Sequence, residues 1–299
     1  MRMRVLLLGG ENRLGRALLA QAAAEFIQLE SVERPEQGWQ PEMADDLLAG
    51  AKPDLVLNLA FYREQFQLGL EDTAALHAQQ QFDERLIQGC ASRGVTLMML
   101  SSARVFDGSK TSSHTEKDEP RPIGALGRLQ AQLEDSLRTQ CPSHIILRFS
   151  WLLDAAPEGP FGQLIAGLKG PSPLALPEEW RGNPTPVADA ARVMLSVLKQ
   201  LDCAASVYGT YHYGSSEVTT WISFAQNVMQ ELIGRGVFSG DVVFQPVAYD
   251  SLPELRGRPQ NAAILGRKLM LVFGIKPRTW RSQLPALLDE LEAEWKTDN

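Results

Sequence analysis

One short stretch near the N-terminus decides the fold: Val5-Leu6-Leu7-Leu8-Gly9-Gly10-Glu11-Asn12-Arg13-Leu14-Gly15. Its apolar run, Val5–Leu8, is typical of a buried β-strand, and the amphipathic segment Leu14–Ala24 that follows is typical of a helix. The glycines between them let backbone amides approach a pyrophosphate, and the N-terminus of the helix carries partial positive charge. The stretch therefore predicts a strand, a nucleotide-binding turn and a helix.

The same alternation continues to about residue 150. Strands are predicted at Phe26–Val32, Asp54–Ala60, Val95–Leu100 and His144–Phe149, and helices at Pro41–Leu48, Thr73–Arg93 and Leu126–Thr139. Strands that alternate with helices in this way indicate a parallel sheet covered on both faces. The sequence therefore predicts an α/β protein with a Rossmann-type, doubly wound parallel sheet.

After Trp151 the pattern changes, because proline and glycine divide the chain into loops. Helices are predicted at Val187–Leu201, Trp221–Ile233 and Arg281–Trp295. We expect residues 1–150 to form a dinucleotide-binding domain, with the helix within 185–203 packed back on it. Residues 151–184 and 204–299 are expected to form a smaller C-terminal α/β lobe that binds the substrate.

Composition excludes several partners. The chain has 299 residues and a formal net charge of −7. An acidic surface repels nucleic acid and anionic lipid, so neither nucleic acid nor a membrane is an expected partner. The cysteines Cys90, Cys141 and Cys203 are too widely spaced for a zinc site and form no disulfide framework. We therefore predict a cytoplasmic protein without a metal.

Several later segments resemble the dTDP-4-dehydrorhamnose reductase family of extended short-chain dehydrogenases/reductases. The segment 54–62 is similar to its D-V-V-I-N-A-A-A-Y motif, 100–108 to I-S-T-D-Y-V-F-D-G, 146–151 to I-L-R-T-S-W and 181–185 to the G-x-P-T loop. The resemblance continues through Arg258-Pro259 as far as Trp280. It implies a Rossmann domain that binds NADP or NAD and a lobe that closes over a nucleotide sugar.

The resemblance also implies the site residues. The cofactor-binding residues are expected to be Gly9, Asn12, Arg13, Leu14, Gly15, Asn58, Ala60, Tyr62 and Ser101. The substrate-binding residues are expected to be Ser102, Trp151, Arg181, Asn183 and Pro184. Tyr211 and Trp221 are expected in the core. By their position after the second predicted strand, Glu30 and Glu33 could bind an adenosine ribose and Arg34 a 2′-phosphate, which leaves NAD and NADP as alternatives. A solvated cluster of charges is an equal alternative for these three residues.

Asn12 departs from the glycine spacing of extended reductases, because it stands where the middle glycine belongs. Asparagine tolerates positive φ better than most residues, so we expect the turn to persist. Its side chain is expected to project toward the phosphates and to weaken cofactor binding.

The catalytic pair is missing. Enzymes of this kind use a tyrosine as proton donor and, four residues later, a lysine whose charge lowers the pKa of the tyrosine. The family's segment P-x-P-x-x-x-Y-G-x-S-K aligns with Pro120–Gln130, so Leu126 stands for the tyrosine and Gln130 for the lysine. Ser102 keeps the hydroxyl of the third catalytic member, whereas Ala103 and Arg104 replace the next two residues of the motif.

Three functions follow from this pattern. The first is a non-catalytic or weakly catalytic protein that binds a dinucleotide or a nucleotide sugar, as a regulatory protein with a protein partner or as a homo-oligomer. The second is an atypical oxidoreductase that reduces a dTDP-4-keto-6-deoxy sugar with another proton donor, such as Arg104 or His114. His114 is expected on a solvated loop. The third is a protein that no longer binds a dinucleotide and acts through protein contacts alone.

Overall fold

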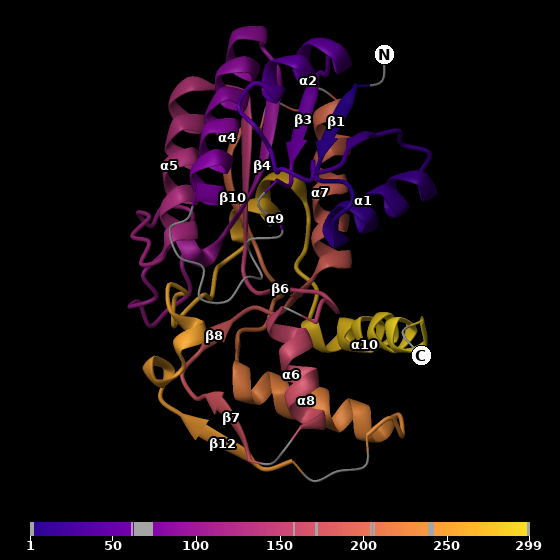
Figure 1. Cartoon of the computed structure of the whole chain (residues 1–299), viewed down its shortest axis with the longest axis vertical. Coiled ribbons are helices and arrows are strands. Elements are labelled where there is room, and N and C mark those ends of the chain that lie inside the picture. The colour runs from indigo at the N-terminus through magenta and orange to yellow at the C-terminus, as the bar shows by residue number, and fades with distance from the viewer. Residues whose placement is uncertain are drawn as a thin grey trace.

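The computed structural model describes residues 3–60, 62, 74–157, 159–170, 173–203, 205, 207–238 and 242–297. A six-stranded parallel sheet in the order β2-β1-β3-β4-β5-β10 forms its larger part (Figure 1). The strands are β1 (Val5–Leu8), β2 (Glu30–Val32), β3 (Leu55–Asn58), β4 (Thr96–Ser102), β5 (His144–Phe149) and β10 (Gly209–Tyr213). The direction of winding reverses between β1 and β3, which places a topological switch point at their carboxyl ends.

Helices cover both faces of the sheet, because its strands are apolar on both sides. Val5 and Leu7 of β1 pack on one face, and Leu6 and Leu8 on the other. The first face is covered by α1 (Arg13–Ala24), α7 (Val187–Asp202) and α9 (Arg267–Phe273). The second is covered by α2 (Met43–Ala51), α4 (Ala74–Arg93) and α5 (Ala125–Gln140). The predicted doubly wound sheet is confirmed.

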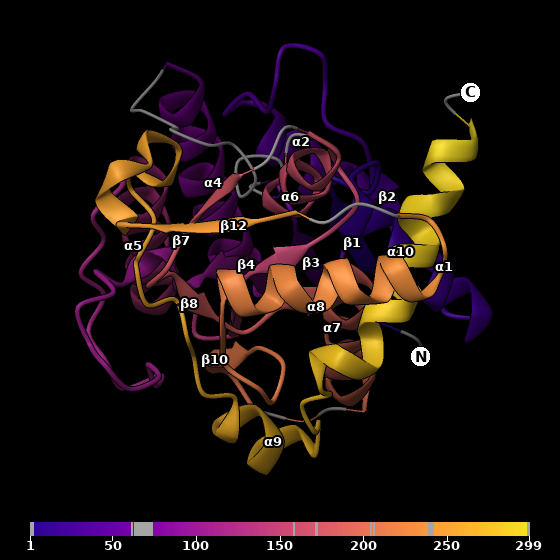
Figure 2. The ribbon, with the colours of Figure 1, turned by 90° about the horizontal axis from the view of Figure 1, so that it is seen from below.

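A smaller lobe lies at the carboxyl edge of the sheet (Figure 1). Its helices are α6 (Pro160–Lys169), α8 (Trp221–Gly234) and α10 (Trp280–Thr297), and it contains short 3-10 turns at Tyr249–Ser251 and Pro253–Leu255. A further 3-10 turn, Ala103–Val105, directly follows β4 of the main sheet. Its strand pairs are β7 (Leu174–Pro177) with β12 (Phe244–Val247), β8 (Arg181–Gly182) with β11 (Thr219–Thr220), and β6 (Leu152–Leu153) with β9 (Thr185–Pro186). Figure 2 shows α8 running beside the β7–β12 pair when the molecule is seen from this end.

Two expectations about the elements differ from the structure. The strand predicted at Phe26–Val32 covers only Glu30–Val32, because Phe26 adopts φ +60° in the turn after α1 and is 82% exposed. The division that assigned residues 204–299 to the smaller lobe is also wrong for β10 and α9. β10 pairs with β5 of the main sheet, and α9 packs its buried Leu269 and Phe273 on the same core.

None of the helices in the described part of the chain combines the length and the apolar character that a membrane crossing requires.

Candidate functional site

The turn between β1 and α1 depends on two of its glycines. Gly9 adopts φ +82°, a conformation that strains a residue with a side chain. At Gly15 a Cβ atom would lie 2.5 Å from the carbonyl oxygen of Gly9 and 2.7 Å from the Cα atom of Gly10. Both glycines therefore allow α1 to begin directly against the end of β1, where Leu14 is fully buried in the core.

Asn12 has a different role from the one expected. It adopts φ −72° and caps α1, so the turn does not require positive φ at this position. Its side-chain oxygen accepts a hydrogen bond from the backbone amide of Gly15 at 2.8 Å, and its side-chain amide lies 3.5 Å from the carbonyl oxygen of Leu59. An asparagine cap typically stabilises a helix by about 1 kcal/mol. The cap also occupies an amide at the helix end where an anion would bind.

A groove of about 430 Å³ opens at the switch point. Gly9, Asn12, Arg13, Ala60 and Tyr62, which the sequence predicts to bind a cofactor, line it. The complete lining is Gly9, Glu11, Asn12, Arg13, Arg16, Arg34, Pro35, Glu36, Trp39, Leu59, Ala60, Tyr62, Asp154 and Ala156. Three guanidinium groups therefore border one groove together with the carboxylates of Glu11, Glu36 and Asp154, so donors for phosphate groups are present beside acidic side chains.

Asn58 acts beneath this groove rather than on its surface. It is buried at the end of β3, where its side-chain oxygen accepts a hydrogen bond from the backbone amide of Ala60 at 2.9 Å. Its side-chain amide donates to Asp83 of α4. Asn58 thereby fixes the loop that carries Ala60 to the groove.

Asp154 connects the smaller lobe with the groove, and no sequence motif predicts this role. Its buried carboxylate accepts a hydrogen bond from the Tyr62 hydroxyl and lies 3.9 Å from Nε of Arg13. Burial, and then the Asp154 charge, raises the pKa of Tyr62 well above its ordinary value. Tyr62 is therefore held as a neutral hydrogen-bond donor.

The edge of the sheet to which the resemblance assigns catalysis, called the catalytic edge below, lies where β4 ends beside α5. The Ser102 hydroxyl donates a hydrogen bond to the side-chain oxygen of Gln130 at 2.7 Å, so the structure brings these two predicted residues together. Leu126 lies one helical turn before Gln130, and both side chains are buried. The side-chain nitrogen of Gln130 is buried and has no acceptor among the described residues. The edge thus holds a hydroxyl and an amide, where the resemblance implies a phenol and an ammonium group.

Ser101 belongs to a buried ionic network rather than to the groove. Its hydroxyl donates to the carboxylate of Glu134 at 2.6 Å, and that carboxylate also accepts hydrogen bonds from Arg148 and Arg138. Arg148 lies 3.3 Å from Nε2 of His212, which is fully buried. Burial, assisted by the Arg148 charge, lowers the pKa of His212 to about 3. This network fixes α5 against β4 and β5, directly beneath Ser102 and Gln130.

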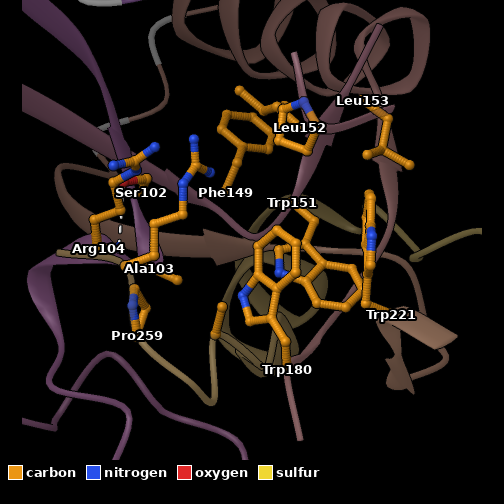
Figure 3. A pocket seen from close by; sticks show the side chains of 13 residues that line it. Ser102, Ala103, Arg104, Phe149, Trp151, Leu152, Leu153, Trp180, Trp221 and Pro259 are labelled. Atoms are coloured by element: carbon orange, nitrogen blue, oxygen red, sulfur yellow. Dashed lines mark hydrogen bonds between the residues drawn. The ribbon is translucent and has the colours of Figure 1, made fainter. Parts of the chain in front are cut away.

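A second, smaller cavity of about 50 Å³ begins at Ser102. Figure 3 shows Ser102 and Arg104 on one side of it and the indoles of Trp151, Trp180 and Trp221 on the other. The remaining lining residues are Ala103, Phe149, Leu152, Leu153, Pro160, Arg258, Pro259 and Ala262. Sequence reasoning missed Trp180 and Arg258 as site residues. Trp221 is buried, as expected, but it also borders the cavity.

Trp151 has a strained backbone in this cavity. It adopts φ +28°, which is unusual for a bulky side chain. A Cβ atom at Gly182 would lie 2.5 Å from the indole, so the glycine makes room for Trp151. Such strain accumulates where the position of a side chain serves a function.

Three other predicted residues do not line the cavity. Arg181 is exposed, and its guanidinium donates to the carbonyl oxygen of Thr111 at 3.3 Å. Asn183 is buried, and it holds the backbone at Ser215 and Ile264 through its side chain. Pro184 is also buried. These three residues therefore lie outside the lining of the cavity.

His114 is buried and not on a solvated loop as expected. Its ring stacks on Phe106 with the centroids 4.1 Å apart, and burial lowers its pKa. It lines neither the groove nor the cavity. His114, a candidate substitute acid from the sequence, therefore packs on Phe106 and does not face the site.

Comparison with known proteins identifies relatives of this chain. The family model described as "RmlD substrate binding domain" matches residues 3–293. The chain belongs to this family. The dTDP-4-dehydrorhamnose reductase of Aggregatibacter actinomycetemcomitans is 25% identical over 291 residues, which cover 94% of this chain and 97% of the relative. That of Escherichia coli K12 is 22% identical, with 97% of this chain and 98% of the relative covered.

Solved structures of the RmlD family share the fold. A dTDP-4-dehydrorhamnose reductase from Clostridium acetobutylicum superimposes with a TM-score of 0.80 at 24% identity and covers 97% of this chain and 100% of that chain. The Bacillus anthracis dTDP-4-dehydrorhamnose reductase, solved in complex with NADP, also gives a TM-score of 0.80, at 18% identity and with the same coverage.

Proposed function

We propose that this RmlD-family protein binds NADP in the groove at the switch point and a nucleotide sugar whose sugar end reaches the cavity beside Ser102, and that it is a poor reductase or none. The observation that carries the proposal is the pair Leu126 and Gln130, buried on one face of α5, with Gln130 hydrogen-bonded to Ser102. The relatives are named dTDP-4-dehydrorhamnose reductases, and one of their structures holds NADP.

The groove suits a dinucleotide. Gly9 and Gly15 bring the backbone of the turn close to the groove, and α1 directs its N-terminus there. Arg13, Arg16 and Arg34 supply positive charge for phosphate groups. A bound NADPH would supply a hydride to a substrate carbonyl. The residues of the turn would hold the pyrophosphate, although Asn12 competes for the amide of Gly15.

Arg34 favours NADP over NAD. It follows β2 and lines the groove, whereas Glu30 and Glu33 are absent from that lining. Its Nη1 atom lies 3.4 Å from the carbonyl oxygen of Ala60, which directs the guanidinium across the groove. A guanidinium binds a 2′-phosphate with charge-assisted hydrogen bonds. A carboxylate at this position would favour the free ribose hydroxyls of NAD.

The chain's own residues would make reduction slow. A carbonyl that accepts a hydride also needs a proton, and Leu126 has none to donate. The Ser102 hydroxyl is directed to Gln130, so it is placed to orient a carbonyl rather than to protonate it. Loss of general acid catalysis typically lowers a rate by about 10²–10⁴-fold.

The proposal is tested by restoring the pair. NADPH titrations of the wild-type protein and of Leu126→Tyr/Gln130→Lys, followed by nicotinamide fluorescence, should both show binding. The double variant should then oxidise NADPH faster with a dTDP-4-keto-6-deoxy sugar. Leu126→Phe/Gln130→Lys is the matched control, because it lacks only the phenolic hydroxyl and should stay slow. No binding of NADPH to the wild-type protein at millimolar concentration would contradict the proposal.

A further inference from the structure

The cavity beside Ser102 has an unusual charge for a site that would hold a neutral keto sugar. Of the thirteen residues that line it, the charged ones are Arg104 and Arg258, and both are cationic. They come from distant parts of the chain, the 3-10 turn after β4 and the loop after Pro253–Leu255. Two guanidinium groups therefore meet at one small, largely apolar cavity.

Both arginines are buried, with exposed fractions of 8% for Arg104 and 7% for Arg258. Burial lowers the pKa of Arg104 to about 10, and burial followed by the Arg104 charge lowers the pKa of Arg258. Two desolvated like charges raise each other's free energy, and an anion between them would lower it.

The indoles add aromatic faces to this positive charge. Trp151, Trp180 and Trp221 line the cavity, and the Arg258 guanidinium lies 6.0 Å from the centroid of the Trp180 ring. The cavity thus combines two cations with aromatic faces against which the apolar face of a sugar ring can pack.

Arg104 stands where the motif resembled by residues 100–108 has a tyrosine. A tyrosine offers one hydroxyl, whereas arginine offers a planar, permanently charged fork that matches a carboxylate or a phosphate. An anionic group therefore suits this position better with Arg104 than with a tyrosine.

We propose that this cavity binds an anionic group, a sugar carboxylate or a phosphate, between Arg104 and Arg258, with the sugar ring against the indoles. The proposal rests on the assignment of this cavity as the nucleotide-sugar site. It adds that the ligand carries a negative charge where the relatives' substrates carry a carbonyl or hydroxyl group.

Tryptophan fluorescence reports on the site directly, since three indoles line it. UDP-glucuronic acid, UDP-glucose and inorganic phosphate are the probes. The first two differ only in a carboxylate against a hydroxymethyl group. We expect UDP-glucuronic acid to bind at least about 10-fold more tightly than UDP-glucose, as one charge-assisted hydrogen bond typically contributes about 1.5–3 kcal/mol.

Arg104→Leu should weaken binding of UDP-glucuronic acid by about 10–100-fold. Arg256→Leu is the matched control, because Arg256 is exposed two residues before Arg258, and it should bind like the wild-type protein. Far-ultraviolet circular dichroism verifies that each variant is folded. If Arg104→Leu is unfolded, Arg104→Tyr, which restores the family's residue, takes its place with the same expectation.

The outcomes separate the source of the anion. If both nucleotide sugars bind equally and both lose affinity in Arg104→Leu, the bound anion is the diphosphate that every nucleotide sugar carries, and the proposal of a charge on the sugar itself is overturned. If phosphate alone binds and Arg104→Leu abolishes it, the anion site is supported and the nucleotide-sugar assignment fails. The proposal is overturned if no probe binds at 10 mM, or if Arg104→Leu leaves every affinity unchanged.

Discussion

Glu134→Gln is expected to remove the electrostatic support of the catalytic edge. The Glu134 carboxylate is fully buried and accepts hydrogen bonds from Ser101, from Nε and Nη2 of Arg148, and from Arg138. Arg148 itself is 2% exposed, so it cannot recover water when the carboxylate becomes an amide. Breaking a buried pair on one side typically costs about 3–5 kcal/mol. We expect the free energy of unfolding to fall by this amount.

The assay is urea unfolding at pH 7, followed by circular dichroism. Asp135→Asn is the matched control, because Asp135 lies 3.8 Å from the same Arg138 but is 76% exposed. An exposed ion pair contributes about 0–1 kcal/mol, so this control should unfold close to the wild-type midpoint. A loss below about 1 kcal/mol in Glu134→Gln would refute the reasoning.

Three further predictions follow from single residues. Asn12→Gly should tighten NADPH binding, measured by nicotinamide fluorescence, because it frees the Gly15 amide; equal or weaker affinity would contradict this role. Arg34→Ala should weaken NADPH binding by about 10-fold and leave NADH binding unchanged, because a charge-assisted hydrogen bond is lost; equal losses for both nucleotides would contradict a 2′-phosphate contact. Between pH 7 and 5 the free energy of unfolding should fall by about 2 kcal/mol through His212 alone. The folded-state pKa of His212 is about 3, below the unfolded value near 6.5, so in this pH range only the unfolded chain takes up the proton. His212→Gln should remove that part of the pH dependence in urea titrations, and an unaltered pH dependence would argue against a neutral, buried imidazole.

The sheet could be predicted from the sequence because its signals are local. Val5–Leu8 and its glycine turn carry their own apolar pattern and spacing, and the structure confirms them. β10 was not predicted because it is far in sequence from the other strands of the sheet: β5 ends at Phe149, and β10 begins only at Gly209, after segments of the smaller lobe. Only its pairing with β5 shows that it belongs to the main sheet.

The site was only partly predictable for the same reason. Ser102 and Gln130 could be found from motif positions, and the structure joins them by a hydrogen bond. Asp154 and Trp180 have no local pattern that marks them, because tertiary packing alone brings them to the groove and the cavity. Arg258 lies in a segment that resembles the family, but the resemblance alone did not place it at the cavity. The buried stack of His114 on Phe106 likewise depends on a contact that spacing does not encode.

The most direct test of the account is the rate at which the wild-type protein oxidises NADPH with dTDP-4-dehydrorhamnose, followed at the nicotinamide absorbance band beside the Escherichia coli reductase. The account predicts that NADPH binds but turns over at least about 10²-fold more slowly than in the Escherichia coli enzyme, because Leu126 donates no proton. Turnover at a comparable rate would contradict it.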